Sequence, residues 1–249
     1  MATGRTDRMS LSSAAHDRVE WALSELRQVL ADRAEDPHAR VALETLRDAF
    51  CAADSRANLD PLTGLLNRAS FDHALEALLG RDGRAPAQAA LMFMDLDGFK
   101  HVNDECGHTI GDHLLQDVAA RIVHCVRDED LLARYGGDEF VVLLDPLASR
   151  EVIQVIASRI IDALSAPLCL AGVCVRLSIS IGVALFPEHG KGAEELVQRA
   201  DAAMYRAKHQ GGRRYLVWSP EWNDQSGSYA KLGSSQRSTS ATDIPLRRA

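Results

Sequence analysis

AALMFMDL, residues 89–96, is a nearly unbroken apolar run in the middle of the chain. A run of this kind is typical of a central β-strand that is covered on both faces. The run ends in Asp95-Leu96-Asp97, so two carboxylates follow directly on the apolar segment. The sequence therefore predicts a buried strand with an acidic end.

Apolar periodicity on both sides of this run predicts the other elements of a central region, residues 59–219. Helices are expected at 115–126, 152–164 and 193–209, and strands at 131–135, 139–144, 173–183 and 215–218. Gly136-Gly137 predicts a tight hairpin between two of the strands, with positive φ at both glycines. The order predicts an α+β fold: a ferredoxin-like palm with a β-α-β-β-α-β core, an additional hairpin and helix, and helices on one face of the sheet.

The flanking regions differ in composition. Residues 1–13 are polar and patternless and are expected to be flexible, whereas residues 14–58 carry helical apolar spacing interrupted at Asp36-Pro37, which predicts an arm of two helices. The arm either packs on the central region or pairs with a second copy, because its apolar seams must be buried somewhere. Residues 220–249 are rich in Ser, Gly and charge and are expected to be a disordered tail.

Composition and charge exclude several classes of protein. The chain has 249 residues and a net charge of -7, which argues against binding a nucleic acid polymer. No apolar run approaches the ~18 residues of a membrane span, and the N-terminus lacks the apolar core of a signal peptide. We therefore expect a cytoplasmic protein with reduced thiols. The five cysteines, which form no CxxC pair, are Cys51, Cys106, Cys125, Cys169 and Cys174.

Two acidic clusters carry the chemistry. One is Asp95 with Asp97, and the other is Asp138 with Glu139 after the Gly-Gly turn. Taken alone, the first reads as a turn and the second as a solvated hairpin. If the hairpin lies beside the central strand, three or four carboxylates converge and repel one another unless cations lie between them. Hard oxygen ligands suit Mg²⁺, with Mn²⁺ as an alternative, and a palm with an acidic edge suggests nucleotidyl transfer.

Short motifs run through the whole central region in a fixed order. They are DPLTGLLNR at 60–68, DLDGFKHVND at 95–104, GH at 107–108 with GD at 111–112, RYGGDEF at 134–140, LSISIG at 177–182 and DAAMYRAK at 201–208. In this order they resemble the motifs of GGDEF domains, the diguanylate cyclases. The resemblance implies the nucleotidyl-cyclase form of the palm and extends from residue 60 to about residue 213.

The resemblance implies a metal and catalytic centre. Asp95, the backbone carbonyl of Leu96 and Asp138 would hold Mg²⁺. Asp138 stands where the family has Asp or Glu, and it is also the family's candidate base for the ribose 3′-hydroxyl. Glu139 would be a second carboxylate beside the metal. Lys100 would neutralise charge that develops on the phosphates.

The resemblance also implies a guanine pocket formed by Asn103 and Asp112, with His108 lining it. A carboxylate accepts hydrogen bonds from guanine N1–H and the exocyclic amine together, whereas adenine offers no such donor pair. The alternative for Asn103 and Asp112 is helix capping, because Gly111-Asp112 also resembles a helix start.

Two further sites follow from position in the family pattern. Lys208 would bind the triphosphate, although a cation at a helix C-terminus is the plain alternative. The family often has Arg four residues later, where this chain has Gly212, so Arg213 is not assigned a phosphate contact. Arg127 and Asp130 occupy the place of the family's RxxD product-inhibition site, where Arg127 would contact a guanine of cyclic di-GMP.

The function implied is that of a diguanylate cyclase. It would condense two GTP into 3′,5′-cyclic di-GMP and two pyrophosphates as a homodimer with one GTP per subunit, and the helical arm would pair the subunits. The alternative is a catalytically silent domain that senses cyclic di-GMP or serves as an interaction platform. Because the acidic pair and both glycines of the signature are present, the sequence favours the enzyme.

Overall fold

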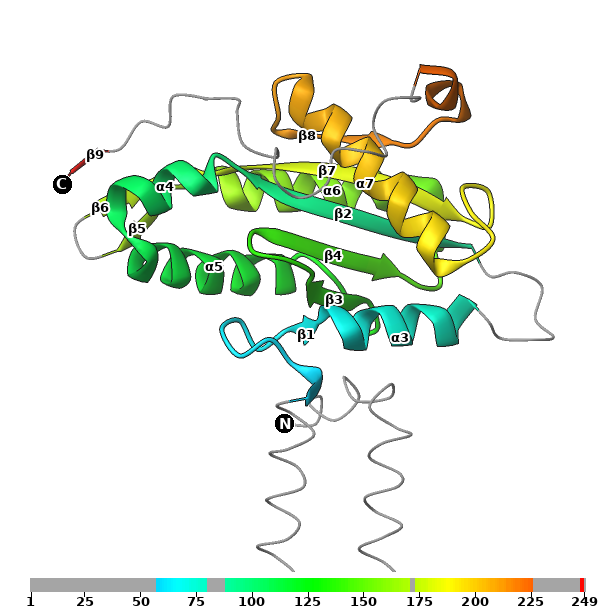
Figure 1. Ribbon diagram of the computed structural model, residues 1–249, viewed down its shortest axis with the longest axis horizontal. Coiled ribbons are helices and arrows are strands. Elements are labelled where there is room, and N and C mark those ends of the chain that lie inside the picture. Colours follow the sequence, from blue (N-terminus) through cyan, green and yellow to red (C-terminus); the bar gives the residue numbers. More distant parts are fainter. Residues whose placement is uncertain (1–56, 80–87, 171–172, 226–246, 249) are drawn as a thin grey trace, which may run out of the picture.

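The computed structural model describes residues 57–79, 88–170, 173–225 and 247–248 (Figure 1). The strands are β1 (Leu66–Asn67), β2 (Ala89–Asp97), β3 (Leu131–Arg134), β4 (Glu139–Leu144), β5 (Leu168–Leu170), β6 (Val173–Val175), β7 (Ser178–Phe186), β8 (Arg214–Val217) and β9 (Arg247–Arg248). The helices are α3 (Arg68–Leu79), α4 (Phe99–Cys106), α5 (His108–Val123), α6 (Arg150–Ser165), α7 (Ala193–His209) and the 3-10 helix η2 (Pro220–Gln225).

The main sheet has six strands in the order β1-β3-β4-β2-β7-β8. The predicted central strand, β2, lies between β4 and β7 and is antiparallel to both (Figure 1). All nine of its residues are buried, which explains why its sequence shows no polar alternation. The α+β palm expected from the sequence is confirmed.

Helices cover both faces of this sheet. The even-numbered side chains of β2, such as Met92 and Met94, pack with α4, α5 and α6, whereas Leu91 and Phe93 pack with α3 and α7. The expectation of helices on one face was therefore wrong. The reason is that side chains of a strand alternate, so an apolar residue at every position needs cover on both sides.

Some element boundaries differ from those that apolar periodicity predicted. The alternation through residues 173–183 predicted one strand, but the chain leaves one sheet after β6 and enters another at β7, with Arg176 and Leu177 between them. The helix expected at 115–126 begins earlier, at His108, and α4 was not predicted as a helix. The arm predicted at 14–58 lies outside the described residues apart from Ala57 and Asn58, which are helical.

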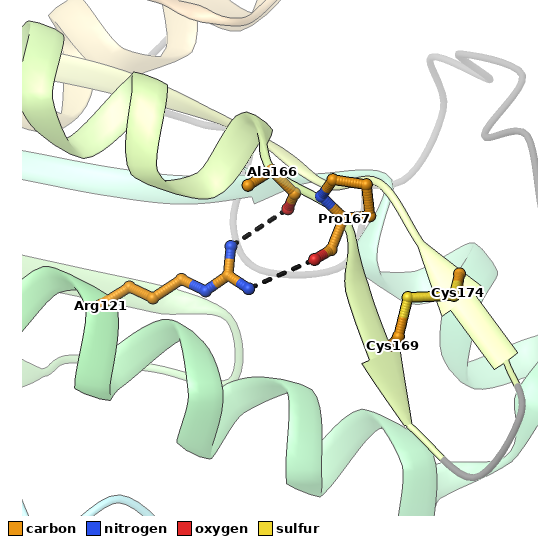
Figure 2. The surroundings of a disulfide bond; sticks show 5 residues. All are labelled: Arg121, Ala166, Pro167, Cys169 and Cys174. Atoms are coloured by element: carbon orange, nitrogen blue, oxygen red, sulfur yellow. Dashed lines mark hydrogen bonds between the residues drawn. A yellow bond between two sulfur atoms is a disulfide. The ribbon is translucent and has the colours of Figure 1, made fainter.

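A disulfide corrects the expectation that all thiols are reduced. Cys169 and Cys174 stand directly opposite each other on the β5–β6 hairpin and are bonded (Figure 2). The antiparallel register places the two side chains together, a proximity that their spacing in the sequence does not reveal. Cys106 and Cys125 are free thiols, and Cys51 lies outside the described residues.

The base of this hairpin is tied to α5 by one arginine. The guanidinium of Arg121 donates to the backbone carbonyl of Ala163 at 2.8 Å. It also donates to the carbonyls of Ala166 and Pro167 at 3.1 and 3.3 Å (Figure 2). These carbonyls lie in the last turn of α6 and directly after it, where backbone oxygens lack partners within the helix. Arg121 therefore joins α5, the end of α6 and the start of the disulfide hairpin.

The C-terminal region departs in part from the predicted disorder. Residues 220–225 form η2, where the ring of Trp222 lies 4.6 Å from the Arg206 guanidinium, and residues 247–248 pair with β6 as β9. Residues 226–246 lie outside the described part of the chain. Within the part that is described, no helix is both long and apolar enough to cross a bilayer.

Candidate active site

The candidate site lies where β2 ends beside the turn between β3 and β4. Asp95 of β2 is directly opposite Glu139, the first residue of β4. The amide of Leu96 donates to the carbonyl of Asp138 at 3.3 Å. The structure therefore brings together the two acidic clusters that the sequence places some forty residues apart.

Asp95 is a buried carboxylate, 6% exposed, in a crowded electrostatic environment. Burial, followed by the negative charges of Asp138 and Glu139, raises its pKa to about 7, although Lys208 acts in the opposite direction. The Lys208 ammonium lies 2.5 Å from Asp95 Oδ1. This carboxylate is thus held close to other negative charge, and an adjacent cation compensates it only in part.

Lys208 reaches Asp95 from the last turn of α7. This helix carries Glu194 and Glu195 in its first turn and three basic residues in its last turn, in keeping with the helix dipole. Gly182 of β7 lets the helix approach the sheet, since a Cβ there would lie 2.0 Å from the Ala200 carbonyl oxygen. Lys208 is therefore more than a helix-end cation, because its ammonium contacts the carboxylate at the end of the central strand.

The turn at Gly136-Gly137 between β3 and β4, here called the signature turn, is tight for a reason other than positive φ angles. Neither Gly136 nor Gly137 takes a positive φ, which corrects the sequence-based prediction. A Cβ on Gly136 would instead lie 2.3 Å from Glu139 Oε2, and the amides of Tyr135 and Gly136 both donate to the Glu139 carbonyl, at 2.8 and 3.3 Å. Gly136 thus provides room for the Glu139 side chain to fold back over the turn.

Arg134 fastens this turn to the start of the domain. Its guanidinium donates to Asp60 Oδ1 at 3.1 Å and to the Gly137 carbonyl at 2.8 Å, and both charged side chains are largely buried. Asp60 also accepts from the Thr63 hydroxyl at 2.7 Å. In the sequence these residues stand out only as letters of two motifs, since an ion pair between residues so far apart leaves no local signal.

Four predicted ligand residues lie on α4 and α5. Lys100 is exposed in the first turn of α4, and Asn103 is partly buried in the same helix. His108 is the exposed first residue of α5, and Asp112 is exposed one turn later, so Asp112 does not cap the helix. A Cβ on Gly111 would lie 1.9 Å from Asn103 Oδ1, so this glycine lets the Asn103 side chain of α4 lie against α5.

Arg127 and Asp130 lie between α5 and β3. The Arg127 amide donates to Asp130 Oδ2 at 2.8 Å, and the Asp130 amide donates to the Arg127 carbonyl at 3.2 Å, which closes a local turn. Burial is the main cause that raises the pKa of Asp130. The Arg127 side chain is exposed and lies 3.8 Å from Glu129.

The donor set fits a hard cation only in part. Among the residues that the structure describes, no three Asp, Glu, His or Cys side chains are arranged to hold a metal ion, although Asp95, Asp138 and Glu139 lie close enough to interact electrostatically. Asp97 is engaged elsewhere, because two serines and a backbone amide donate hydrogen bonds to it. Asp95 and Asp138 offer carboxylate oxygens at this strand end, and Mg²⁺ commonly uses one or two carboxylates together with substrate phosphates.

Comparison with known proteins identifies the family. A family model described as "Diguanylate cyclase, GGDEF domain" matches residues 57–214, more than half of the chain. The chain belongs to the GGDEF domain family. The solved GGDEF domain of TpbB from Pseudomonas aeruginosa (PAO1) is 43% identical, with a TM-score of 0.63, and the match covers 65% of this chain and 95% of that one.

Curated relatives of this GGDEF domain carry different names. TpbB of Pseudomonas aeruginosa (strain UCBPP-PA14), a diguanylate cyclase, is 44% identical over 172 residues, 68% of this chain and 40% of TpbB. PdeR of Escherichia coli (strain K12), a cyclic di-GMP phosphodiesterase, is 37% identical over 187 residues, 75% of this chain and 28% of PdeR. The chain thus spans less than half the length of these two relatives.

One solved relative includes a segment besides its GGDEF domain. It is the coiled coil and GGDEF domain of DgcB from Caulobacter crescentus in complex with c-di-GMP. It is 29% identical, with a TM-score of 0.67, and the match covers 76% of this chain and 98% of that one.

Proposed function

We propose that this GGDEF domain is a diguanylate cyclase that condenses two GTP into 3′,5′-cyclic di-GMP and two pyrophosphates. The observation that carries the proposal is the contact of Lys208 with Asp95 at a strand end where Asp138 and Glu139 add further negative charge. Such a site combines carboxylates for a cation with an ammonium for phosphate. Because GTP is an intracellular substrate, we expect the enzyme to act in the cytoplasm.

Asp95, the Leu96 carbonyl and Asp138 would hold Mg²⁺ or Mn²⁺. When bound, the ion would supply Lewis-acid polarisation of the phosphates and lower the pKa of the attacking hydroxyl. Glu139 would add negative charge beside the ion. Lys100 and Lys208 would neutralise charge on the phosphates, a role that suits the point charge of an ammonium.

The reaction joins two half-sites. The 3′-oxygen of each GTP attacks the α-phosphorus of the other, so one P–O bond forms at each centre while the bond to pyrophosphate breaks. A ligated carboxylate is a poor proton acceptor, so we expect the hydroxyl proton to leave to water rather than to Asp138. Asn103 and Asp112, with His108 nearby, would select guanine through its paired donors.

A single half-site cannot complete this reaction, so we propose a homodimer paired through the arm at residues 14–58. The DgcB structure supports this proposal, because it contains a coiled coil together with its GGDEF domain and aligns with 76% of this chain. Pairing would raise the effective concentration of one half-site at the other. Specific activity should then fall on dilution below the dimer dissociation constant, and activity that does not change on dilution would contradict an obligate dimer.

We propose that Arg127 and Asp130 form an inhibitory site for the product. The exposed Arg127 guanidinium is available to a guanine edge, while the turn closed by Asp130 fixes its backbone. Added cyclic di-GMP should inhibit turnover in the wild type, and the Arg127→Ala variant should need roughly tenfold more product for the same inhibition. Equal inhibition of both proteins would place the inhibitory site elsewhere.

The decisive experiment is incubation of the purified chain with GTP and Mg²⁺, with the products separated by chromatography. We expect cyclic di-GMP and pyrophosphate from GTP, and no cyclic dinucleotide from ATP or in the presence of a chelator. The Asp138→Ala variant should lose activity by roughly a thousandfold, because it lacks a predicted metal ligand. A folded wild-type dimer that binds cyclic di-GMP but forms none from GTP would instead support the silent sensor.

A further inference from the structure

Asp97 is a buried acidic residue that the proposed reaction does not use. It is 8% exposed and lies two residues after Asp95, so both side chains are on the same face of β2. Its Oδ2 accepts from the Ser178 hydroxyl at 2.6 Å, and its Oδ1 accepts from the Ser180 hydroxyl at 2.7 Å. Both serines belong to β7, the strand that pairs with β2 on this side.

The third partner of Asp97 comes from the turn between α7 and β8. The backbone amide of Arg213 donates to Asp97 Oδ2 at 3.1 Å. This turn has three successive positive φ angles: 104° at Gly211, 65° at Gly212 and 49° at Arg213. For Arg213 this conformation is unfavourable in isolation, and it persists only where surrounding contacts determine it.

Gly212 packs directly against the same carboxylate. A Cβ at this position would lie 2.7 Å from Asp97 Oδ2 and 3.1 Å from Oδ1. Glycine is therefore required here for its φ and also for the close approach. Gly212 stands where the family often has arginine, and this contact supplies a physical reason for glycine in this chain.

The turn that Asp97 holds also closes the end of α7. The Gly211 amide donates to the Lys208 carbonyl at 3.2 Å, and the Gly212 amide donates to the Ala207 carbonyl at 3.1 Å. Lys208 therefore has its backbone fixed by this turn, while its ammonium contacts Asp95. Two aspartates at the end of β2 therefore act on Lys208. Asp95 contacts its ammonium directly, and Asp97 holds the turn that hydrogen-bonds to its backbone carbonyl.

We propose that Asp97 is a positioning residue that fixes the α7–β8 turn and thereby presents the Lys208 ammonium to the nucleotide phosphates. The inference rests on the proposed function, since Lys208 is placed on the triphosphate there. Asp97 acts through hydrogen bonds to the turn and to β7, and it touches neither substrate nor metal. Its acceptor oxygens are required, whereas its negative charge is not.

Two substitutions separate hydrogen bonding from charge. In Asp97→Asn the amide oxygen can remain on Ser178 and the Arg213 amide, while the amide nitrogen donates to the Ser180 hydroxyl, which is able to accept. In Asp97→Ala all three bonds are lost. We expect Asp97→Ala to raise the KM for GTP by about tenfold with kcat changed less than threefold, and Asp97→Asn to stay within about threefold of the wild type in both.

A metal ligand or general base would behave differently, because the amide could not replace it. A kcat that falls by more than about tenfold in both Asp97→Asn and Asp97→Ala would overturn the proposal. As a second route, Gly212→Ala displaces the turn from the other side and leaves Asp97 in place. It should raise KM to a similar extent, and an unchanged KM in this variant would also contradict the inference.

A double-mutant cycle tests whether Asp97 acts through Lys208. If it does, Asp97→Ala should cause little further loss of GTP affinity in a Lys208→Met background, whereas multiplicative losses would show independent action. Hydrogen exchange of the Arg213 amide gives a readout that does not depend on enzyme activity. We expect exchange to be at least about tenfold faster in Asp97→Ala and unchanged in Asp97→Asn. Equal exchange in all proteins would reject the positioning role, even if GTP turnover were absent.

Discussion

The Asp95→Asn variant should lose cyclase activity by about a thousandfold or more, yet unfold at a higher temperature than the wild type above pH 7. Activity falls because the amide removes the negative charge of a predicted metal ligand. Stability rises because Asp95 is buried beside Asp138 and Glu139, and its charge is unfavourable in the folded protein. The same carboxylate would therefore be costly for folding and necessary for catalysis.

The raised pKa of Asp95 determines how the stability of the wild type changes with pH. The pKa of Asp95 is raised from 3.8 to about 7 in the folded protein, so between these values the folded state binds more protons than the unfolded state. Wild-type stability must then fall as pH rises through this window, by up to about 4 kcal/mol for one such group. Below pH 4 the wild type and Asp95→Asn should be equally stable, and the difference should be complete above pH 7.

Thermal unfolding of both proteins from pH 4 to pH 8, without divalent cations, measures this difference. Asp117→Asn is a matched control, because Asp117 is exposed on α5 and is not part of the proposed site. The control should retain both activity and the pH profile of the wild type. If the stability difference between Asp95→Asn and the wild type were the same at pH 4 and pH 8, the charge of Asp95 would not destabilise the folded protein.

Gly182→Ala should be among the most destabilising single substitutions in this domain. A Cβ at this position of β7 would lie 2.0 Å from both the Ala200 carbonyl oxygen and the Met204 amide nitrogen. These are backbone atoms of α7, so no side-chain rotation can relieve the overlap. The helix would have to move away from the sheet, and we expect the free energy of unfolding to fall by about 3 kcal/mol or more.

Urea unfolding monitored by circular dichroism provides the measurement. Gly192→Ala is the control, because a Cβ on Gly192 meets no atom within 4 Å and its φ is -151°. The control should unfold close to the wild-type midpoint. A wild-type midpoint for Gly182→Ala would mean that α7 does not lie as close to β7 as described, and the position of Lys208 would then also be in question.

Periodicity was sufficient for the main elements because each depends on local burial. The run at 89–96 is β2, and the apolar spacing of 193–209 corresponds to α7 with the same bounds. The break between β6 and β7 was missed because the residues alternate through it, although the two strands belong to different sheets. The disulfide between Cys169 and Cys174 was missed because it depends on strand register.

The sequence by itself determined the central strand, the α+β palm and the motifs that identify the family, since these follow from residue order and local apolar pattern. Tertiary structure alone decided that Lys208 contacts Asp95 and that Arg134 joins Asp60 to the signature turn, contacts that span 113 and 74 residues. It also separated two identical side chains. Asp95 and Asp97 share one strand and one face, but Asp95 meets an ammonium, whereas Asp97 meets two hydroxyls and an amide. The role of a carboxylate depends on the donors and charges around it, and here those come from β4, β7 and the end of α7.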